Sequence, residues 1–337
     1  MFWPSRKTPD GTVDLPFRFR RARKTPAVRD LLRQTRVSVD DLILPVFVEE
    51  GITAKSAVDT LPGVFRHPEA DLPAVVADAW SASIKAVLLF GVSHHKDAEG
   101  SASWAENGLI ARMVRATRKA APDMVILTDN CFCSYTTHGH CGVVVGDHVD
   151  NDLTLQNLQK QAVAAAEAGV DFVAPSAMMD GQVAAMRQAL DEAGFEDVGI
   201  LSYSTKFASS LYGPFRAAAA CDLKGDRRSY QIDPANLREA LAESEQDEAE
   251  GADMLMVKPG LAYLDVLTKV RDRTHLPLAV YQVSGEYAML KAAAAAGALN
   301  EKAAVMETLL AFKRAGADLI ITYYAREVAG WLTEESV

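Results

Sequence analysis

Eight short apolar runs recur between residues 42 and 322, and this regular recurrence constrains the fold more than any other feature of the sequence. Segments with helical spacing separate the runs, such as Thr154–Ala168, in which Leu155, Leu158 and Ala162 mark one face. Each run is short enough to be a buried strand, so the pattern predicts strands that alternate with helices. The runs are Leu42–Val48, Ala86–Phe90, Met124–Thr128, Phe172–Ala174, Gly199–Tyr203, Met254–Val257, Leu278–Val283 and Leu319–Thr322.

The same phrase, a glycine followed by an apolar residue and an aspartate, leads into three of these runs. It stands at Ala168–Asp171, Glu250–Asp253 and Ala315–Asp318. Glycine in such a phrase is typical of the left-handed residue that ends a helix before a strand begins. With no break in composition along this region, the pattern predicts a (β/α)8 (TIM) barrel over residues 36–337. A doubly wound open sheet is the alternative, but it needs a glycine-rich phosphate turn after its first strand, which Phe47–Gly51 is not.

Residues 1–35 precede the barrel and are polar, with five basic residues between positions 18 and 24. Phe17 and Phe19 alternate with the arginines. A solvated tail is one interpretation of this segment. The two aromatic residues favour the other, an N-terminal arm that lies on a second surface and makes oligomer contacts.

Charge and composition exclude several classes of partner. The net charge of −10 argues against a protein that binds nucleic acid. No apolar run reaches the ~18 residues that a membrane-spanning helix needs, so no membrane partner is expected. Met1–Thr12 has no apolar signal core, which predicts a cytoplasmic location.

Two lysines stand where runs end, and in a (β/α)8 barrel the chemistry belongs at the carboxyl ends of the strands. Lys258 closes the run that begins at Met254, and Lys206 follows Leu201–Thr205. Burial on both faces of a strand disfavours a cation, so we expect a lowered pKa and a nucleophilic amine at Lys258. A single lysine could simply emerge into solvent there, but a second one favours the nucleophilic interpretation. Two amines suggest two carbonyl substrates, each held as a Schiff base.

Three of the four cysteines lie within eleven residues, in the long loop after the third run: Cys131, Cys133 and Cys141. This spacing can place three thiolates around one zinc ion and leave a fourth tetrahedral position for water or substrate, as in catalytic zinc sites. A structural zinc site would need a fourth ligand, which His138 or His140 could supply. Redox-active cysteines are the third interpretation. The distant fourth cysteine is expected to be an unliganded thiol.

The loop Phe207–Pro234 is too long to be a simple connection and predicts a lid or binding loop. Arg216 and Arg227 lie in it, near Tyr212 and Gln231. Arginines on a mobile lid suit a carboxylate, which they bind through paired hydrogen bonds, although a solvated charged loop is the simpler alternative. Hydroxyl groups at the last two strand ends could bind a second carboxylate. These hydroxyl groups belong to Ser284 and Tyr323. Asp129 and Ser176 are the polar residues expected at the ends of the third and fourth strands.

From about Leu42 to the C-terminus, the chain resembles the porphobilinogen synthase family, also called the 5-aminolaevulinate dehydratases. The cysteine cluster is similar to that of the zinc-dependent branch of the family. The resemblance implies a hydro-lyase that condenses two 5-aminolaevulinate molecules to porphobilinogen with loss of two waters, in tetrapyrrole biosynthesis. The phrases that carry it are Ser202–Ser209, Tyr212–Arg216, Gly225–Gln231, Met254–Gly260, Val283–Glu286 and Ile321–Tyr324.

The resemblance also implies residue roles. Lys206 and Lys258 each form a Schiff base with one substrate, and the three clustered cysteines bind a catalytic Zn²⁺. In the loop Phe207–Pro234, the matching residues Arg216, Arg227 and Gln231 hold one substrate carboxylate, and Tyr212 is a further substrate-binding residue. The remaining matches, at the second carboxylate and around the substrate amine, are Ser284, Tyr323, Asp129 and Ser176.

Family members typically form homo-octamers, built from dimers whose N-terminal arms embrace neighbouring barrels. Some also bind an allosteric Mg²⁺ at a subunit interface, and Glu243 falls near the matching place in a weakly matching stretch. The chain departs from the family at Ala177, where aspartate is common, and at Ser134, where the zinc-type phrase usually has proline. Neither departure removes a lysine or a zinc ligand.

Two other functions fit parts of the pattern. A class I aldolase would share the barrel and one Schiff-base lysine, but it would need neither a second lysine nor three clustered cysteines. A barrel that zinc merely stabilises would keep the cysteines and have no use for two amines. Formation of a pyrrole from 5-aminolaevulinate separates all three hypotheses.

Overall fold

The computed structural model describes residues 6–7, 10, 13–14, 17–221, 223 and 225–334. It divides into two compact units, residues 1–36 and 37–337. Within the described ranges, none of the helices combines the length and the apolar character needed to span a bilayer.

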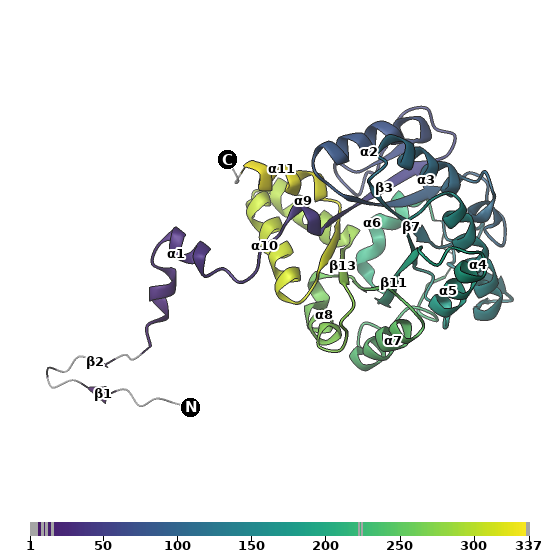
Figure 1. Cartoon of the computed structure of the whole chain (residues 1–337). Helices are drawn as coiled ribbons and strands as arrows, with labels where there is room; N and C mark the ends of the chain where they lie inside the picture. Colours follow the sequence, from purple (N-terminus) through teal and green to yellow (C-terminus); the bar gives the residue numbers. More distant parts are fainter. Residues whose placement is uncertain are drawn as a thin grey trace. The chain divides into compact units, whose positions relative to one another are not determined.

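A closed ring of parallel strands forms the centre of the larger unit (Figure 1). The ring closes where β14 pairs with β3, with Ile320 opposite Leu42. The predicted (β/α)8 barrel is therefore confirmed. The ring is made of β3 (Leu42–Glu49), β6 (Ala86–Val92), β7 (Val125–Asn130), β10 (Phe172–Pro175), β11 (Gly199–Lys206), β12 (Met254–Lys258), β13 (Leu278–Gln282) and β14 (Leu319–Thr322).

Helices surround the strands, as Figure 1 shows, and cover them from solvent. All five residues of β12 are buried, as are all eight of β3. The glycines of the repeated phrase, Gly169, Gly251 and Gly316, have φ values of 96°, 101° and 111°, the left-handed region in which glycine ends a helix without a steric penalty. The helices are α2 (Leu72–Ser81), α3 (Leu109–Ala120), α4 (Asn151–Glu167), α5 (Gln182–Glu192), α6 (Gly213–Ala218), α7 (Leu237–Ala249), α8 (Leu264–Arg271), α9 (Ser284–Ala295), α10 (Glu301–Arg314) and α11 (Ala325–Glu334).

Smaller elements fill the connections. Strand β5 (Phe65–Pro68) pairs with β3 and with β4 (Ser56–Ala57). The loop after β7 contains a hairpin of β8 (Val143–Val145) and β9 (His148–Asp150), and the loop after β11 contains α6. The 3-10 helices of the larger unit are η2 (Val39–Asp41), η3 (Glu69–Asp71), η4 (Ser101–Trp104), η5 (Ser210–Tyr212) and η6 (Leu261–Tyr263).

The expected strand ends need small corrections. Ser284 is the first residue of α9 rather than the end of a strand, because β13 ends at Gln282. Tyr323 follows the last residue of β14, and Asp129 is the penultimate residue of β7. These side chains still lie at the carboxyl rim of the barrel, where the prediction placed them.

The smaller unit contains a strand pair, β1 (Arg6–Lys7) and β2 (Val13–Asp14), a 3-10 helix η1 (Phe19–Arg23) and α1 (Pro26–Leu31). The Thr25 hydroxyl accepts the N–H of Val28 and so caps helix α1, whose first residue is Pro26. None of the residues in η1 or α1 is buried within the single chain.

Candidate active site

The two lysines lie side by side at the rim of the barrel. Lys206 on β11 and Lys258 on β12 are register partners, and each is only 5% exposed. The pairing of these strands shifts register between Ser202 and Thr205, and such a bulge re-aims the side chains that follow it. The Lys206 amine consequently lies over the ring of Tyr203, three residues earlier on the same strand, at 5.5 Å.

Aromatic rings enclose the amine of Lys258. Its nitrogen lies 4.2 Å from the ring centre of Tyr281 and 4.8 Å from that of Tyr203, with Phe215 at 5.2 Å. Burial, and after it the neighbouring Lys206, lower the pKa of Lys258 to about 7 against the opposing charge of Asp129. The predicted direction of this pKa shift therefore agrees with the structure. At neutral pH a substantial fraction of the amine is uncharged.

Polar groups from β7 and the loop after β10 face the two amines. The Lys206 amine donates a hydrogen bond to the carbonyl of Ser176. Burial raises the pKa of Asp129, while Lys258 and Lys206 act in the opposite direction, and its Oδ1 has no hydrogen-bond partner. An unpaired buried carboxylate oxygen beside two amines is suited to proton exchange with groups bound between them.

The sulfur atoms of Cys131, Cys133 and Cys141 lie within 4.8 Å of one another, and all three residues are buried. They form the one such group of cysteine, histidine or acidic side chains among the described residues. Hydrogen bonds from the Cys131 and Cys141 thiols lower the pKa of Cys133, which favours the thiolate that metal ions bind. The cluster can therefore hold a metal ion.

Neither histidine considered as a fourth ligand joins this group. The ring of His138 contacts the carbonyl of Ala98, and that of His140 contacts the Tyr230 hydroxyl at 3.1 Å. Cys221 also lies outside the group, with its sulfur 3.9 Å from the Ser134 hydroxyl.

A cavity of about 20 Å³ joins the lysines to the cysteine cluster. It brings together nine of the predicted residues from five parts of the chain. This volume is far below the roughly 300 Å³ at which small-molecule sites usually begin, so the site is closed in this structure. The lining residues are Asp129, Cys131, Cys133, Ser176, Lys206, Tyr212, Phe215, Arg216, Arg227 and Lys258.

The other predicted substrate-binding residues lie beside the cavity. Gln231 is buried, and its Nε2 has no hydrogen-bond partner. The Ser284 hydroxyl accepts the N–H of Phe215 at 3.0 Å and donates to the carbonyl of Leu211, so it fastens the start of the lid. Tyr323 is 6% exposed and stacks on Phe47, with ring centres 6.3 Å apart.

Sequence reasoning missed the aromatic enclosure of Lys258 by Tyr203, Tyr281 and Phe215. Tyr281 stands in the middle of β13, where an apolar core residue is the ordinary interpretation. Tyr203 could have been found only by anticipating the register shift that turns it toward the lysines. The possible magnesium residue, Glu243, lies on the outer helix α7, where burial and then Asp180 raise its pKa.

The fold and the site define a (β/α)8-barrel enzyme with paired buried lysines beside a metal-binding thiol cluster. The family model described as delta-aminolevulinic acid dehydratase matches residues 16–331. The Escherichia coli (strain K12) delta-aminolevulinic acid dehydratase is 58% identical over 317 residues, covering 94% of this chain and 98% of the relative. The Halalkalibacterium halodurans enzyme of the same name is 49% identical, covering 96% and 99%. The chain belongs to the delta-aminolevulinic acid dehydratase family.

The barrel also matches a solved member of this family. The crystal structure of the Toxoplasma gondii ME49 delta-aminolevulinic acid dehydratase (porphobilinogen synthase), in complex with the reaction product porphobilinogen, superimposes with a TM-score of 0.94 at 46% identity. The match covers 99% of this chain and 97% of that one. The predicted family and hydro-lyase activity are confirmed, and they are supported over the aldolase alternative.

Proposed function

We propose that the chain converts two molecules of 5-aminolaevulinate to porphobilinogen and two waters while Lys206 and Lys258 each hold one substrate as a Schiff base. The observation that carries this proposal is the pairing of two buried amines in register on neighbouring strands. Two ketones tethered this close react as parts of one molecule, which removes most of the entropic barrier to joining them.

The surroundings of the lysines supply what Schiff-base chemistry needs. Lys258, with a pKa of about 7, attacks a ketone as the free amine, and its aromatic enclosure limits the access of water to the adduct. Asp129 is the carboxyl group placed to take up and return the protons that move during the two dehydrations. Lys206 is held in place by its hydrogen bond to the Ser176 carbonyl.

Zinc is the ion that best suits the thiol cluster. Three buried cysteine sulfurs within 4.8 Å of one another form a soft donor set, and three protein ligands are typical of catalytic zinc. Zinc held by Cys131, Cys133 and Cys141 would supply Lewis-acid polarisation beside the substrate. The proposal includes no magnesium step, because Glu243 belongs to no metal-binding group among the described residues.

The lid residues suit the carboxylates of the substrate. Arg216 on α6 and Arg227 both line the cavity, and Arg227 is 8% exposed, so its charge would act in a site with little competing water. Gln231 lies next to Arg227 in the same loop. Ser284 and Tyr323 are the hydroxyl groups proposed for the second carboxylate, and Ser284 lies against the start of the lid.

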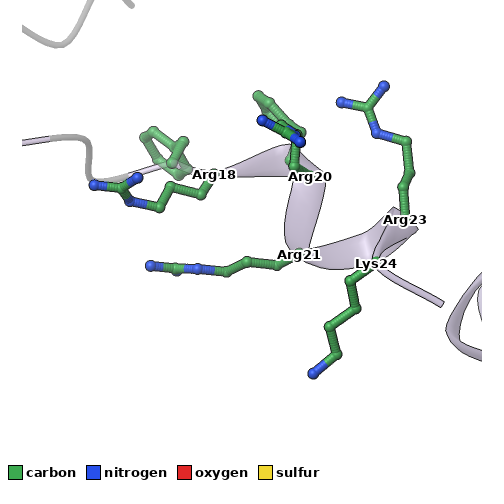
Figure 2. Close-up of a pocket in the computed structure, with 7 residues that line it drawn as sticks. Arg18, Arg20, Arg21, Arg23 and Lys24 are labelled. Atoms are coloured by element: carbon green, nitrogen blue, oxygen red, sulfur yellow. The ribbon is translucent and has the colours of Figure 1, made fainter.

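The smaller unit is suited to contacts between copies of the chain. Phe17 and Phe19 are 65% and 77% exposed, and Leu31 is 80% exposed. Figure 2 shows the basic side chains in and beside η1, from Arg18 to Lys24, pointing away from the short helix in different directions. Exposed apolar residues set among basic side chains favour an arm that docks on another subunit, so the proposed assembly is a homo-octamer. None of the four cysteines, all of them described, forms a disulfide, which suits the reducing cytoplasm, the proposed location.

Incubation with 5-aminolaevulinate and zinc, followed by the colour reaction for the pyrrole, tests this function. Lys206→Ala and Lys258→Ala should each lower turnover by at least about a thousandfold, because each removes one tether. Lys→Arg at either position should restore nothing, since arginine keeps the charge without being a nucleophile. Lys160→Ala on α4, outside the site, is the matched control. Near-normal pyrrole formation by either lysine variant would contradict the proposal.

A further inference from the structure

A buried carboxylate behind the Lys258 turn has no part in the proposed chemistry. Glu286, in the first turn of α9, is 2% exposed. Its Oε2 accepts the backbone N–H of Val283 at 2.7 Å and that of Gly260 at 3.4 Å, and its Oε1 accepts that of Leu261. In the described part of the chain no basic side chain pairs with it, so backbone N–H groups are its partners.

The backbone N–H groups that Glu286 accepts come from residues that follow two different barrel strands. Gly260 and Leu261 follow Lys258 after the intervening Pro259, and Val283 follows the end of β13. An ordinary helix cap would bind only the N–H groups of its own first turn. Glu286 instead ties the carboxyl ends of β12 and β13 together through a single side chain.

The turn after Lys258 is confined on its other sides as well. A Cβ atom at Gly260 would lie 2.7 Å from the ring of Phe312, so that ring leaves the backbone no room to move outward. The Lys258 carbonyl accepts the N–H of Phe207 at 3.0 Å and the Tyr212 hydroxyl at 3.3 Å. Glu286 thus completes a set of contacts that fixes the peptide groups directly after the nucleophilic lysine.

The first turn of α9, which contains Glu286, also contacts the lid. Ser284, which follows Val283, bonds the backbone of Leu211 and Phe215 through its hydroxyl. Gly285 packs so closely that a Cβ there would lie 2.6 Å from the Leu211 carbonyl oxygen. The ring of Phe215 in turn covers the Lys258 amine at 5.2 Å. A displacement of the first turn of α9 would therefore move the lysine turn and the start of the lid together.

We propose that Glu286 is a positioning residue that holds the Lys258 amine in its reactive place under the lid without touching substrate. This inference rests on the proposed Schiff-base function. A carboxylate is suited to the task because it only accepts hydrogen bonds, so several N–H donors can converge on it. A glutamine amide of the same size would turn its own N–H groups toward those donors. It would therefore lose the hydrogen bonds to the residues after β12 or to the residue after β13.

The two lysines provide an internal comparison that separates positioning from general stability. Glu286 contacts the turn after Lys258 and makes no hydrogen bond to β11, which carries Lys206. Glu286→Gln should therefore slow Schiff-base formation at Lys258 while the rate at Lys206 stays the same. A purely structural role would lower the folded fraction and reduce both adducts in proportion.

Asp247 offers a matched control. It is likewise a buried carboxyl group, 7% exposed, whose pKa burial raises to about 7, but it bonds the Ser202 hydroxyl from the outer helix α7. Asp247→Asn removes a comparable buried charge away from the Lys258 turn. It should lower thermal stability and leave the initial rate of labelling at Lys258 unchanged, because its partner Ser202 lies on β11, the strand that carries Lys206.

The experiment uses the full chain loaded with zinc, treated with 5-aminolaevulinate and borohydride for increasing times, with adducts quantified by peptide mass mapping. In Glu286→Gln the initial rate of labelling at Lys258 relative to Lys206 should fall at least about tenfold, and kcat should fall with it. Glu286→Asp, which keeps the acceptor on a shorter stem, should recover part of the ratio, and it replaces the glutamine variant if that one does not fold.

The labelling pattern distinguishes failure of the positioning role from failure of the proposed function. An unchanged labelling ratio in the Glu286 variants, with both lysines labelled in the unmodified chain, would overturn the positioning role. Failure to label either lysine in the unmodified chain would overturn the proposed function itself.

Discussion

At the scale of single residues, the surroundings of the Lys258 amine explain how a lysine can be a nucleophile at neutral pH. An ordinary lysine has a pKa of about 10.4 and is almost entirely charged there. Burial among aromatic rings penalises the charge, and the nearby Lys206 amine penalises it again. The rings themselves attract a cation, but this attraction does not outweigh the loss of water, since the net direction of the pKa shift is downward.

This pKa shift predicts how the reactivity of Lys258 depends on pH. Because the free amine attacks, the rate of borohydride-trapped adduct formation at Lys258 should rise about tenfold per pH unit below 7 and level off above it. Peptide mapping across pH 5.5 to 9 measures this rate at the one residue. A rate that keeps rising toward the pKa of an ordinary lysine would show that burial does not lower the pKa of Lys258.

At the scale of elements, the loop after β7 brings distant parts of the chain to the barrel rim. Cys131 and Cys133 follow the strand directly, and Cys141 precedes the β8–β9 hairpin. The Val143 N–H bonds the Thr154 hydroxyl of α4, which fixes the hairpin to the helix outside the barrel. Arg227 of the lid donates to the Gly139 carbonyl at 3.0 Å, so the lid and the cysteine loop hold each other in position.

Metal removal should therefore act on the chemistry and leave the barrel folded, since the cysteines lie in a loop and take no part in the strand pairing that closes the barrel. A strong chelator should abolish pyrrole formation, circular dichroism should remain unchanged, and added zinc should restore activity. Elemental analysis gives the metal content at each step. Full activity in protein shown to be free of metal would exclude this role for the cluster.

Most of the barrel, but less of the site, could be predicted from the sequence. The strands have a local signature, because glycine, an apolar residue and aspartate mark the helix-to-strand turns at Gly169, Gly251 and Gly316. The hairpin after β7 was missed because its strands are only three residues long. The role of Glu286 cannot be predicted from the sequence, because its turn contacts are backbone groups of Gly260 and Leu261, which no side-chain pattern reveals.

At the scale of the whole molecule, the proposed octamer depends on the N-terminal unit. Deletion of residues 1–35 should lower the mass of the assembly measured by light scattering and leave the barrel folded, because the two units are compact by themselves. Phe17→Ser together with Phe19→Ser should act in the same direction by removing exposed apolar surface. A full-length chain that is a stable monomer would contradict the assembly.

The most direct test of the central claim is to locate the covalent adducts. The chain loaded with zinc is reduced with borohydride in the presence of 5-aminolaevulinate over a wide range of concentrations, digested and mapped by mass spectrometry. Two tethers predict adducts on the peptide that contains Lys206 and on the peptide that contains Lys258. Labelling of Lys258 alone at every substrate concentration would contradict the two-lysine mechanism.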